Sequence, residues 1–228
     1  MSEIQMNARM PVVELFEGIS AADCQKILAN AYQREMFPSE VIFRVGDLRK
    51  SILLLIEGRV KVTQVSRGGD DVILWLNSPG QIVGSLTLEP EGTYSSTAHA
   101  VQACKLVVWD ADAFRSNLLR FPALVRNSQR IIARQYSELS CRIREISTES
   151  TDSRLASELI RLAGQVGHRK NGRFELNLSQ RELAQMTAMS HFTANRRLTE
   201  WQRQGLLARR NRTIVILDLS GLERLTSR

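Results

Sequence analysis

The sequence of 228 residues has few cysteines and no long hydrophobic run. Its three cysteines, Cys24, Cys104 and Cys141, are far apart and never form a CxxC pair, which fits a reducing compartment better than a disulfide framework. The longest aliphatic run, Ile52–Ile56, is far too short to cross a bilayer. Residues 1–16 have no basic segment followed by an apolar core, so no signal peptide is predicted. We therefore expect a soluble, cytoplasmic protein without a membrane partner.

Motifs of several enzyme classes are also missing. The chain has no GxxxxGK(S/T) phosphate loop, no HExxH zinc helix and no GxSxG nucleophile turn. His99 is the only histidine in residues 1–147, whereas a metal-dependent enzyme of the cupin type needs several histidines and a carboxylate at one site. We predict that the protein is not an enzyme and has no metal site.

Basic charge is concentrated in the C-terminal third. From Thr148 onward there are 14 Lys and Arg against 8 Asp and Glu, a surplus of 6, whereas residues 1–147 have 17 against 16, a surplus of 1. The surplus is almost entirely arginine, whose planar guanidinium suits two-point contacts with phosphate and guanine. Neutralising a phosphate backbone requires such a surplus, and a merely solvated basic face is the alternative.

Two short helices are predicted within residues 178–207. Ser179 followed by Glu182 is a capping box, so the first helix begins at Gln180. Ser190 caps a second helix that begins at the next residue. Two such helices joined by a tight turn describe a helix-turn-helix, although an αα-corner in any helical domain has the same pattern.

The segment after the second helix favours the helix-turn-helix. Gly205 ends the helix, and residues 206–217 then read as a strand, a turn at Asn211–Arg212 and a second strand. This is the wing of a winged helix, and it places Arg209, Arg210 and Arg212 beside the second helix.

The N-terminal half has a different pattern. Residues Val12–Ala31 are predicted to form a helix, and from Arg34 to Asp110 apolar residues alternate with polar ones. Turn residues recur about every ten positions, among them Glu91–Gly92, and no repeat of fixed period stands out. Many short strands indicate a β-sandwich or β-roll and not a parallel α/β sheet.

A long helix is predicted from Pro122 to about Ser147. Its apolar residues alternate by four and three, a heptad seam interrupted by Gln129, and the flanking positions are charged. A narrow seam with solvated flanks favours pairing with a second copy, whereas packing on the chain's own roll is the alternative. The predicted dimer interface consists of Val125, Ile132, Tyr136, Leu139, Ile143 and Ile146. The polar segment Thr148–Asp152 is a hinge, giving three parts: 1–121, 122–147 and 148–228.

This order of elements resembles the cAMP receptor protein / fumarate-nitrate reductase regulator (CRP/FNR) family of bacterial transcription factors, and the resemblance covers essentially the whole chain. Its marks are FRVGD at 43–47, IEGRVKV at 56–62, LNSPGQIVG at 76–84 and LSQRELAQMTAMSHFTANRRLTEWQRQGLL at 178–207. The resemblance implies an α+β fold with an N-terminal cyclic-nucleotide-binding-like β-roll, a long dimerisation helix and a C-terminal winged helix-turn-helix.

The segment VGSLTLEPEGTYSSTAHA at 83–100 departs from the family's cyclic-nucleotide cassette. Members that bind a cyclic nucleotide have Gly-Glu near its start, where Glu holds the ribose, and Arg-Ser later, where Arg neutralises the phosphate. Here Ser85 and Ser95 replace the Glu and the Arg. Burying an anion without a cation is costly, so no physiological cAMP binding is predicted. An unknown effector is expected between the roll and the long helix, at Gly84, Ser85, Leu86, Ser95, Ser96, Ile132 and Tyr136.

Other sensing chemistries known in the family also lack their ligands. Three isolated cysteines cannot supply the thiolates of an iron–sulfur cluster. His99 is the roll's only candidate haem ligand, and a structural role in a strand is commoner. Cys104 or Cys141 as a redox switch stays open beside the commoner buried, inert thiol. No cofactor is therefore predicted.

The second helix of the helix-turn-helix, which would contact the bases, departs from the family as well. Many members have Arg-Glu after the capping Ser and an Arg four positions later, where this chain has His191, Phe192 and Arg196. Arg196 is expected to bond guanine O6 and N7. Phe192 either contacts a thymine methyl group or packs against the wing. Ala188 replaces a turn Gly, at a cost of about 1 kcal/mol if its φ is positive.

The operator is therefore expected to differ from the family's common palindrome. Arg197 occupies a position that is usually apolar, and Thr193, Asn195 and Arg181 are predicted to contact phosphates and not bases. The predicted DNA-binding residues are Ser179, Gln180, Arg181, Ser190, His191, Phe192, Thr193, Asn195, Arg196, Arg197, Arg210 and Arg212.

These features predict a homodimeric, sequence-specific transcriptional regulator controlled by an effector other than cAMP. Its expected partners are a pseudo-palindromic double-stranded DNA, a second copy of the chain and RNA polymerase. The alternatives are an effector-independent regulator that acts by its abundance, and a redox- or haem-responsive regulator.

Overall fold

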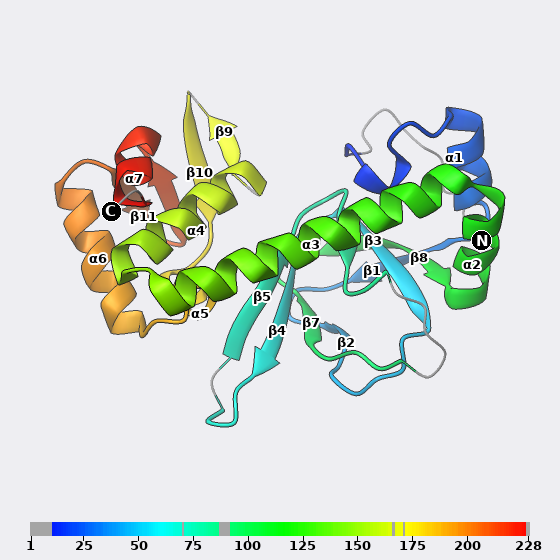
Figure 1. The fold of residues 1–228 in the computed structure, drawn as a ribbon, viewed down its shortest axis with the longest axis horizontal. Helices are drawn as coiled ribbons and strands as arrows, with labels where there is room; N and C mark the ends of the chain where they lie inside the picture. The colour runs from blue at the N-terminus through cyan, green and yellow to red at the C-terminus, as the bar shows by residue number, and fades with distance from the viewer. Residues whose placement is uncertain (1–10, 70, 87–91, 166, 171, 227–228) are drawn as a thin grey trace. The chain divides into compact units, whose positions relative to one another are not determined.

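The computed structural model describes residues 11–69, 71–86, 92–165, 167–170 and 172–226. Seven α-helices and three antiparallel sheets occur in these residues, which confirms the predicted α+β class (Figure 1). None of the described helices combines the length and the apolar character needed to cross a bilayer.

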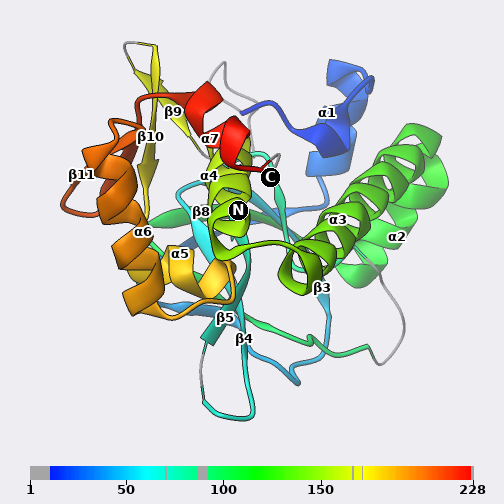
Figure 2. The ribbon, with the colours of Figure 1, turned by 60° about the vertical axis from the view of Figure 1, so that its left-hand side comes forward.

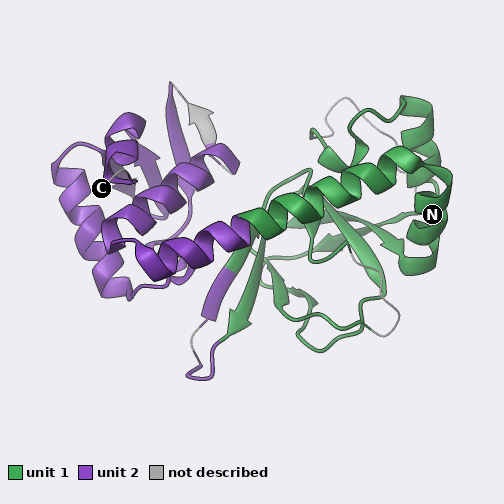
Figure 3. Cartoon of the chain, in the orientation of Figure 1, with its two compact units in different colours: residues 1–65, 74–137 green, residues 66–73, 138–228 purple. Residues whose placement is uncertain are grey.

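The chain forms two compact units (Figure 3). The N-terminal unit is residues 1–65 with 74–137, and the C-terminal unit is residues 66–73 with 138–228. Helix α3 (Pro122–Thr148) belongs partly to each unit, so the unit boundary falls within this helix. The division of the chain into 1–121, 122–147 and 148–228 stays a prediction.

Eight strands make the predicted roll. They are β1 (Tyr32–Met36), β2 (Val41–Phe43), β3 (Ser51–Glu57), β4 (Val60–Val65), β5 (Asp71–Asn77), β6 (Ile82–Val83), β7 (Thr97–Ala100) and β8 (Cys104–Asp110). One sheet has the order β1-β8-β3-β6 and the other β2-β7-β4-β5. Most of the predicted turns separate these strands; of the turn at Glu91–Gly92, Glu91 lies outside the described residues.

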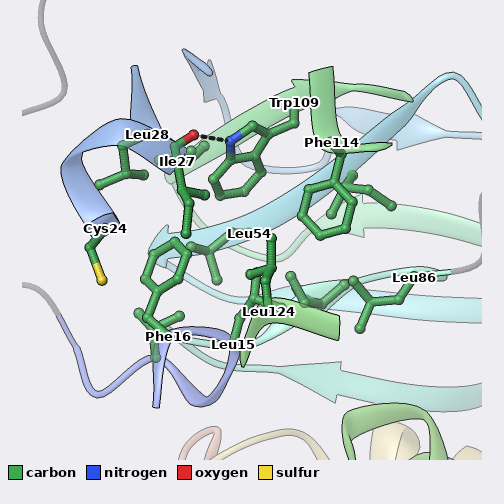
Figure 4. Packing of buried hydrophobic residues seen from close by; sticks show 14 of the residues in the cluster. Leu15, Phe16, Cys24, Ile27, Leu28, Leu54, Leu86, Trp109, Phe114 and Leu124 are labelled. Carbon is green, nitrogen blue, oxygen red and sulfur yellow. Dashed lines mark hydrogen bonds between the residues drawn. The ribbon is translucent and has the colours of Figure 1, made fainter. Parts of the chain in front are cut away.

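The first sheet separates two hydrophobic clusters because neighbouring residues of a strand face opposite sides. Ile52 and Leu54 of β3 face one cluster, together with Trp109, Phe114 and other residues (Figure 4). Leu53 and Leu55 of the same strand face the other, inside the roll. Strand β3 is therefore apolar along its central residues, without the polar alternation of a strand that has one solvated face.

Trp109 joins the roll to the N-terminal helix. Its ring is fully buried and its Nε1 donates a hydrogen bond to the backbone oxygen of Ile27 at 2.8 Å (Figure 4). Burying an indole without a partner for its N–H would be costly, so this bond fixes the position of the helix that carries Ile27.

The prediction of one helix over Val12–Ala31 is wrong. The segment forms a short 3-10 turn, η1 (Glu14–Phe16), and a separate helix α1 (Ala21–Leu28). Gly18 has a φ of +70°, a left-handed conformation that interrupts a right-handed helix. Ser20 then caps α1 by accepting a hydrogen bond from the backbone N–H of Asp23 at 3.1 Å.

Helices follow the roll as predicted. Helix α2 (Ala111–Arg120) begins directly after β8, and α3 begins at Pro122, where a missing N–H has no consequence. Asn127 anchors α3 within the N-terminal unit, because its buried amide donates to the backbone oxygens of Leu15 and Glu17 at 3.0 and 2.8 Å.

The C-terminal unit contains the predicted helices and wing (Figures 1 and 2). In chain order it has α4 (Thr151–Gln165), β9 (His168–Lys170), β10 (Arg173–Asn177), α5 (Gln180–Met186), α6 (His191–Arg203), β11 (Leu207–Arg210), β12 (Thr213–Ile216) and α7 (Leu219–Thr226). The sheet order is β11-β12-β10-β9. Strand β9 pairs antiparallel with β10 at the edge of this sheet. The predicted polar hinge is shorter than expected, since only Glu149 and Ser150 separate α3 from α4.

A buried cluster of four charged side chains joins the end of α3 to α4. Arg142 Nη2 lies 3.0 Å from Glu158 Oε1, and Arg161 Nη2 lies 2.8 Å from Glu145 Oε1. Arg161 also pairs with Glu158. Glu158 is 2% exposed, and this burial raises the pKa of its carboxyl against the opposing effect of the two guanidinium groups.

Candidate nucleic-acid interface

Helices α5 and α6 begin at the residues that their caps predict. Ser179 and Glu182 form the capping box, with Ser179 N donating to Glu182 Oε2 at 2.7 Å and Glu182 N to Ser179 Oγ at 3.2 Å. Ser190 Oγ accepts from Thr193 N at 3.1 Å at the start of α6. Both hydroxyls therefore stabilise the two helices from within the chain.

The turn between the helices contains a strained residue. Ala188 has a φ of +52°, a left-handed conformation that a side chain disfavours. The positive φ at Ala188 is the condition under which alanine in place of glycine was expected to lower stability.

Helix α6 is held by one face and exposed on the other. Ala194, Leu198 and Trp201 are buried, as their helical spacing predicts. On the outer side Phe192 is 75% exposed. This exposure excludes close packing of Phe192 against the wing and leaves its ring available to a ligand.

Four arginines of this region are exposed, and their side chains have no hydrogen bond or ion pair to any residue that the structure describes. They are Arg181 on α5, Arg196 and Arg203 on α6, and Arg210 on β11. An unpaired guanidinium on the surface keeps its full charge and all five of its N–H donors for a partner. Arg203 was not among the predicted contact residues, although its spacing of seven from Arg196 places both on one helix face.

Other predicted contact residues have partners within the chain. Arg197 Nε lies 2.7 Å from Asp152 Oδ1 on α4, and Arg212 Nη2 lies 3.7 Å from Glu182 Oε2. Arg212 nonetheless has a mostly exposed side chain, whereas that of Arg197 is about one-third exposed.

One wing arginine binds α6 directly. Arg209 Nε donates to Gln202 Oε1 at 2.8 Å, Nη1 to Asn195 Oδ1 at 2.8 Å, and Nη2 to Thr199 Oγ1 at 3.0 Å. The sequence placed Arg209 beside the helix but did not indicate these three bonds, because they depend on how β11 packs against α6.

The cassette of the roll surrounds a stacked aromatic pair. The rings of Phe43 and Tyr94 lie 3.7 Å apart and nearly parallel. Gly84 has a φ of +86°, and a Cβ there would lie 3.1 to 3.2 Å from both rings, so the position requires glycine. Tyr94 OH donates to Ser51 O at 3.3 Å, and burial raises the pKa of its phenol.

A cation also lies at the cassette. Arg49 Nη1 donates to Ser85 Oγ at 3.4 Å, although Arg49 precedes the cassette by more than 30 residues. Ser96 is buried, Ser95 is exposed, and Leu86 packs into the cluster of Figure 4. The sequence comparison with the family's cassette did not account for a guanidinium supplied from outside it.

The predicted seam on α3 is largely solvent-exposed. Tyr136 is 74% exposed, Ile143 66%, Ile146 46% and Ile132 37%, while Val125 and Leu139 are partly buried. Large apolar side chains at heptad spacing on a helix seldom remain in water.

The candidate sensing cysteines differ in exposure: Cys104 is buried, whereas Cys141 is half-buried, with Arg144 Nη2 3.6 Å from its Sγ. Burial raises the pKa of the Cys24 and Cys104 thiols, which makes them less reactive. His99 lies in β7, paired with Val41 and Lys61 on the adjacent strands. Among the residues described, no group of three or more His, Cys, Asp or Glu side chains is arranged to hold a metal ion.

Comparisons with known proteins match both units. Residues 33–120 match the cyclic nucleotide-binding domain, and residues 153–225 match the Crp-like helix-turn-helix domain. The chain belongs to the CRP/FNR family of transcription factors. It is therefore a DNA-binding transcriptional regulator with an effector-binding domain, in a family of regulators and not of enzymes.

Relatives in the CRP/FNR family cover most of the chain. The chain is 26% identical over 211 residues to the cyclic AMP receptor protein of Thermus thermophilus, covering 92% of this chain and 94% of that protein. It is 26% identical over 191 residues to the transcriptional activator protein FnrA of Stutzerimonas stutzeri, covering 83% and 78%. The fold is similar to that of the c-di-GMP responsive regulator CLP of Xanthomonas campestris, with a TM-score of 0.75 and 20% identity over 86% of this chain and 99% of that one.

Proposed function

We propose that this CRP/FNR protein is a cytoplasmic homodimer that binds a pseudo-palindromic DNA sequence and acts on RNA polymerase at promoters. The observation that carries the proposal is the group of four unpaired arginines around α6. DNA affinity depends mainly on cations that replace the counterions of phosphates, and these four are not neutralised within the described chain.

Recognition is assigned to the outer face of α6. Arg196 reads guanine O6 and N7, and Phe192 contacts a thymine methyl group, since both side chains are exposed on the helix. Arg181, Arg203, Arg210 and Arg212 bind phosphates. The hydroxyls of Ser179 and Ser190 and the guanidinium of Arg197 support the helices and contribute less to DNA directly.

The dimer forms along α3. Pairing of two copies buries the exposed side chains of Tyr136, Ile143 and Ile146, with Val125, Ile132 and Leu139 completing the seam. A two-fold axis then places two copies of α6 about 34 Å apart, one helical turn of B-DNA, which fits successive major grooves.

The effector is assigned to the cassette and the adjoining part of α3, at Gly84, Ser85, Leu86, Ser95, Ser96, Ile132 and Tyr136. Ser85 lacks the charge with which a carboxylate accepts strongly from a ribose, and Ser95 lacks the charge that would neutralise the phosphate, so cAMP is not the proposed effector. Arg49, which already donates to Ser85, is added to the candidates as a cation in contact with the cassette. Binding there shifts the population of α3 arrangements, and with it the DNA affinity.

A second candidate is an effector-independent regulator. The Phe43–Tyr94 stack packs against Gly84, and Leu86 is buried in the hydrophobic core. Side chains therefore occupy part of the space at the cassette.

Footprinting on DNA selected from a random pool tests the proposal. Two protected half-sites related by two-fold symmetry are expected, with a dimer in analytical ultracentrifugation. Protection without symmetry would contradict the dimer. Titration calorimetry with cAMP and c-di-GMP separates the two candidates: heat from either ligand argues against effector independence, and tight cAMP binding overturns the cassette assignment.

A further inference from the structure

Three side chains along one flank of α6 share a single guanidinium. Asn195, Thr199 and Gln202 recur at spacings of four and three, so they lie in one row facing the wing. Arg209 on β11 donates one hydrogen bond to each, over distances of 2.8 to 3.0 Å.

The chemistry of the guanidinium determines how the two amides are turned. Arginine has five N–H donors and no acceptor, so only an amide oxygen can face it. Asn195 Oδ1 and Gln202 Oε1 therefore face Arg209, and their NH2 groups point away from the guanidinium.

Thr199 offers no free hydrogen-bond donor to a ligand on this flank. Its hydroxyl accepts from Arg209 Nη2 at 3.0 Å and donates to the backbone oxygen of Asn195 at 2.8 Å. The hydroxyl proton is thus used within the helix, and the flank offers ligands the N–H groups of the amides.

We infer, on the basis of the proposed DNA binding, that Arg209 is a positioning residue that makes the wing-side flank of α6 a donor-only surface. Such a surface takes acceptors: guanine O6 and N7, thymine O4 or a phosphate oxygen. It disfavours adenine in the two-point manner of asparagine, because the amide oxygen would have to accept from adenine N6 while it already accepts from Arg209. In Asn195 this oxygen is bound to Arg209.

A double-mutant cycle on the full-length dimer tests the inference, with affinities measured on the selected wild-type operator. Arg209→Ala is expected to weaken binding about tenfold, the size of one lost directional contact. In the Asn195→Ala, Gln202→Ala background the same change is expected to have less than a twofold effect, because Arg209 acts through those amides. Equal effects in both backgrounds would overturn the inference.

The salt dependence of binding separates positioning from direct phosphate contact. Arg209→Ala is expected to leave the slope of log affinity against log salt unchanged, whereas the neighbouring control Arg210→Ala lowers it by about 2 per dimer. A decrease of similar size in Arg209→Ala would overturn the inference. Arg209→Lys, which keeps the charge but cannot bind three acceptors in one plane, is expected to weaken binding as Arg209→Ala does.

Selection of operators by the variants identifies the acceptor. If Asn195 faces a base, Arg209→Ala frees the amide oxygen of Asn195. This variant is then expected to gain a preference for adenine at one position per half-site. If Asn195 faces a phosphate, affinity falls evenly for all sequences. Both results support a donor-only flank. A wild-type adenine preference that disappears in Asn195→Ala would overturn it.

A readout without DNA separates this inference from the proposed function. Absence of any duplex binding by the wild-type protein would refute the proposed function. The hydrogen bonds from Arg209 to α6 would still be tested by NMR of the free protein. Slow exchange of the Arg209 Nε–H that becomes faster in Gln202→Ala supports the inference. Exchange at the rate of an exposed arginine overturns it.

Discussion

The C-terminal unit uses arginine in two opposite ways. Arg142 is buried and Arg161 partly buried between α3 and α4, and each is paired with a glutamate. Arg196 and Arg210 are exposed and unpaired among the described residues. Formal charge is therefore a poor measure of the charge offered to DNA. Of the surplus counted from the sequence, only the exposed, unpaired part can replace counterions.

The buried arginines also cost more to lose. A buried carboxylate that loses its partner is left uncompensated in a low dielectric, whereas an exposed arginine on the surface loses only a solvated charge. Substitutions in the first group should therefore change stability, and those in the second should change DNA binding at constant stability.

The largest effect is expected from Arg142→Ala. Glu158 keeps Arg161 but loses its other cation, and the free energy of unfolding is expected to fall by about 3 kcal/mol in chemical denaturation. Arg196→Ala, the matched exposed control, should change it by less than about 0.5 kcal/mol. Equal losses in the two variants would contradict the difference expected between a buried, paired arginine and an exposed, unpaired one.

The pH dependence of this loss of stability tests the interaction of Arg142 with Glu158. Burial raises the pKa of Glu158. A carboxyl whose pKa is raised by folding contributes most to stability below its unfolded pKa, and this contribution is lost as pH rises through the folded pKa. Removing Arg142 raises the folded pKa further. The deficit of Arg142→Ala should therefore shrink as pH is lowered from 7 toward that pKa, and a deficit that grows would contradict the assignment.

Helix α3 extends the comparison to apolar residues, since Arg142 is buried and the adjacent Ile143 is 66% exposed. Ile143→Glu is expected to convert the dimer to a monomer in ultracentrifugation and to weaken operator binding at least 100-fold, because two linked half-sites become one. Ser140→Glu, at an exposed position outside the seam, is the control and should remain dimeric.

Arg196→Ala tests the exposed group. Affinity for the selected operator is expected to fall about 10-fold to 100-fold, and the preference for guanine at one position per half-site should disappear. Retention of the guanine preference would show that another residue reads that base.

The smallest effect is expected at a residue without charge. Ala188→Gly relieves the left-handed strain in the turn and should raise the free energy of unfolding by about 1 kcal/mol, with operator affinity unchanged. Lower stability in thermal unfolding would contradict this account of the turn.

Local signals explain what the sequence predicted well. The capping box of Ser179 and Glu182, the cap at Ser190 and the turn at Asn211 each involve residues within four positions, so the helices and the wing were placed correctly. The break at Gly18 was missed because a single glycine did not outweigh the apolar spacing around it.

Tertiary packing explains what remained hidden. Arg197 meets Asp152 across 45 positions, and Arg49 meets Ser85 across 36. The sequence could identify arginines near the DNA-binding helices, but it could not show which of them are bound within the protein. Arg209 is the clearest case, because it lies in the basic wing and yet bonds three side chains of α6.

The salt dependence of operator affinity in wild-type protein, Arg210→Ala and Arg197→Ala measures which arginines bind phosphates. Eight phosphate contacts per dimer, from Arg181, Arg203, Arg210 and Arg212, predict a wild-type slope of about −7. Arg210→Ala should lower its magnitude by about 2, and Arg197→Ala, whose guanidinium is paired with Asp152, should leave it unchanged. A wild-type affinity that does not vary with salt, or equal slopes for the two variants, would contradict the account.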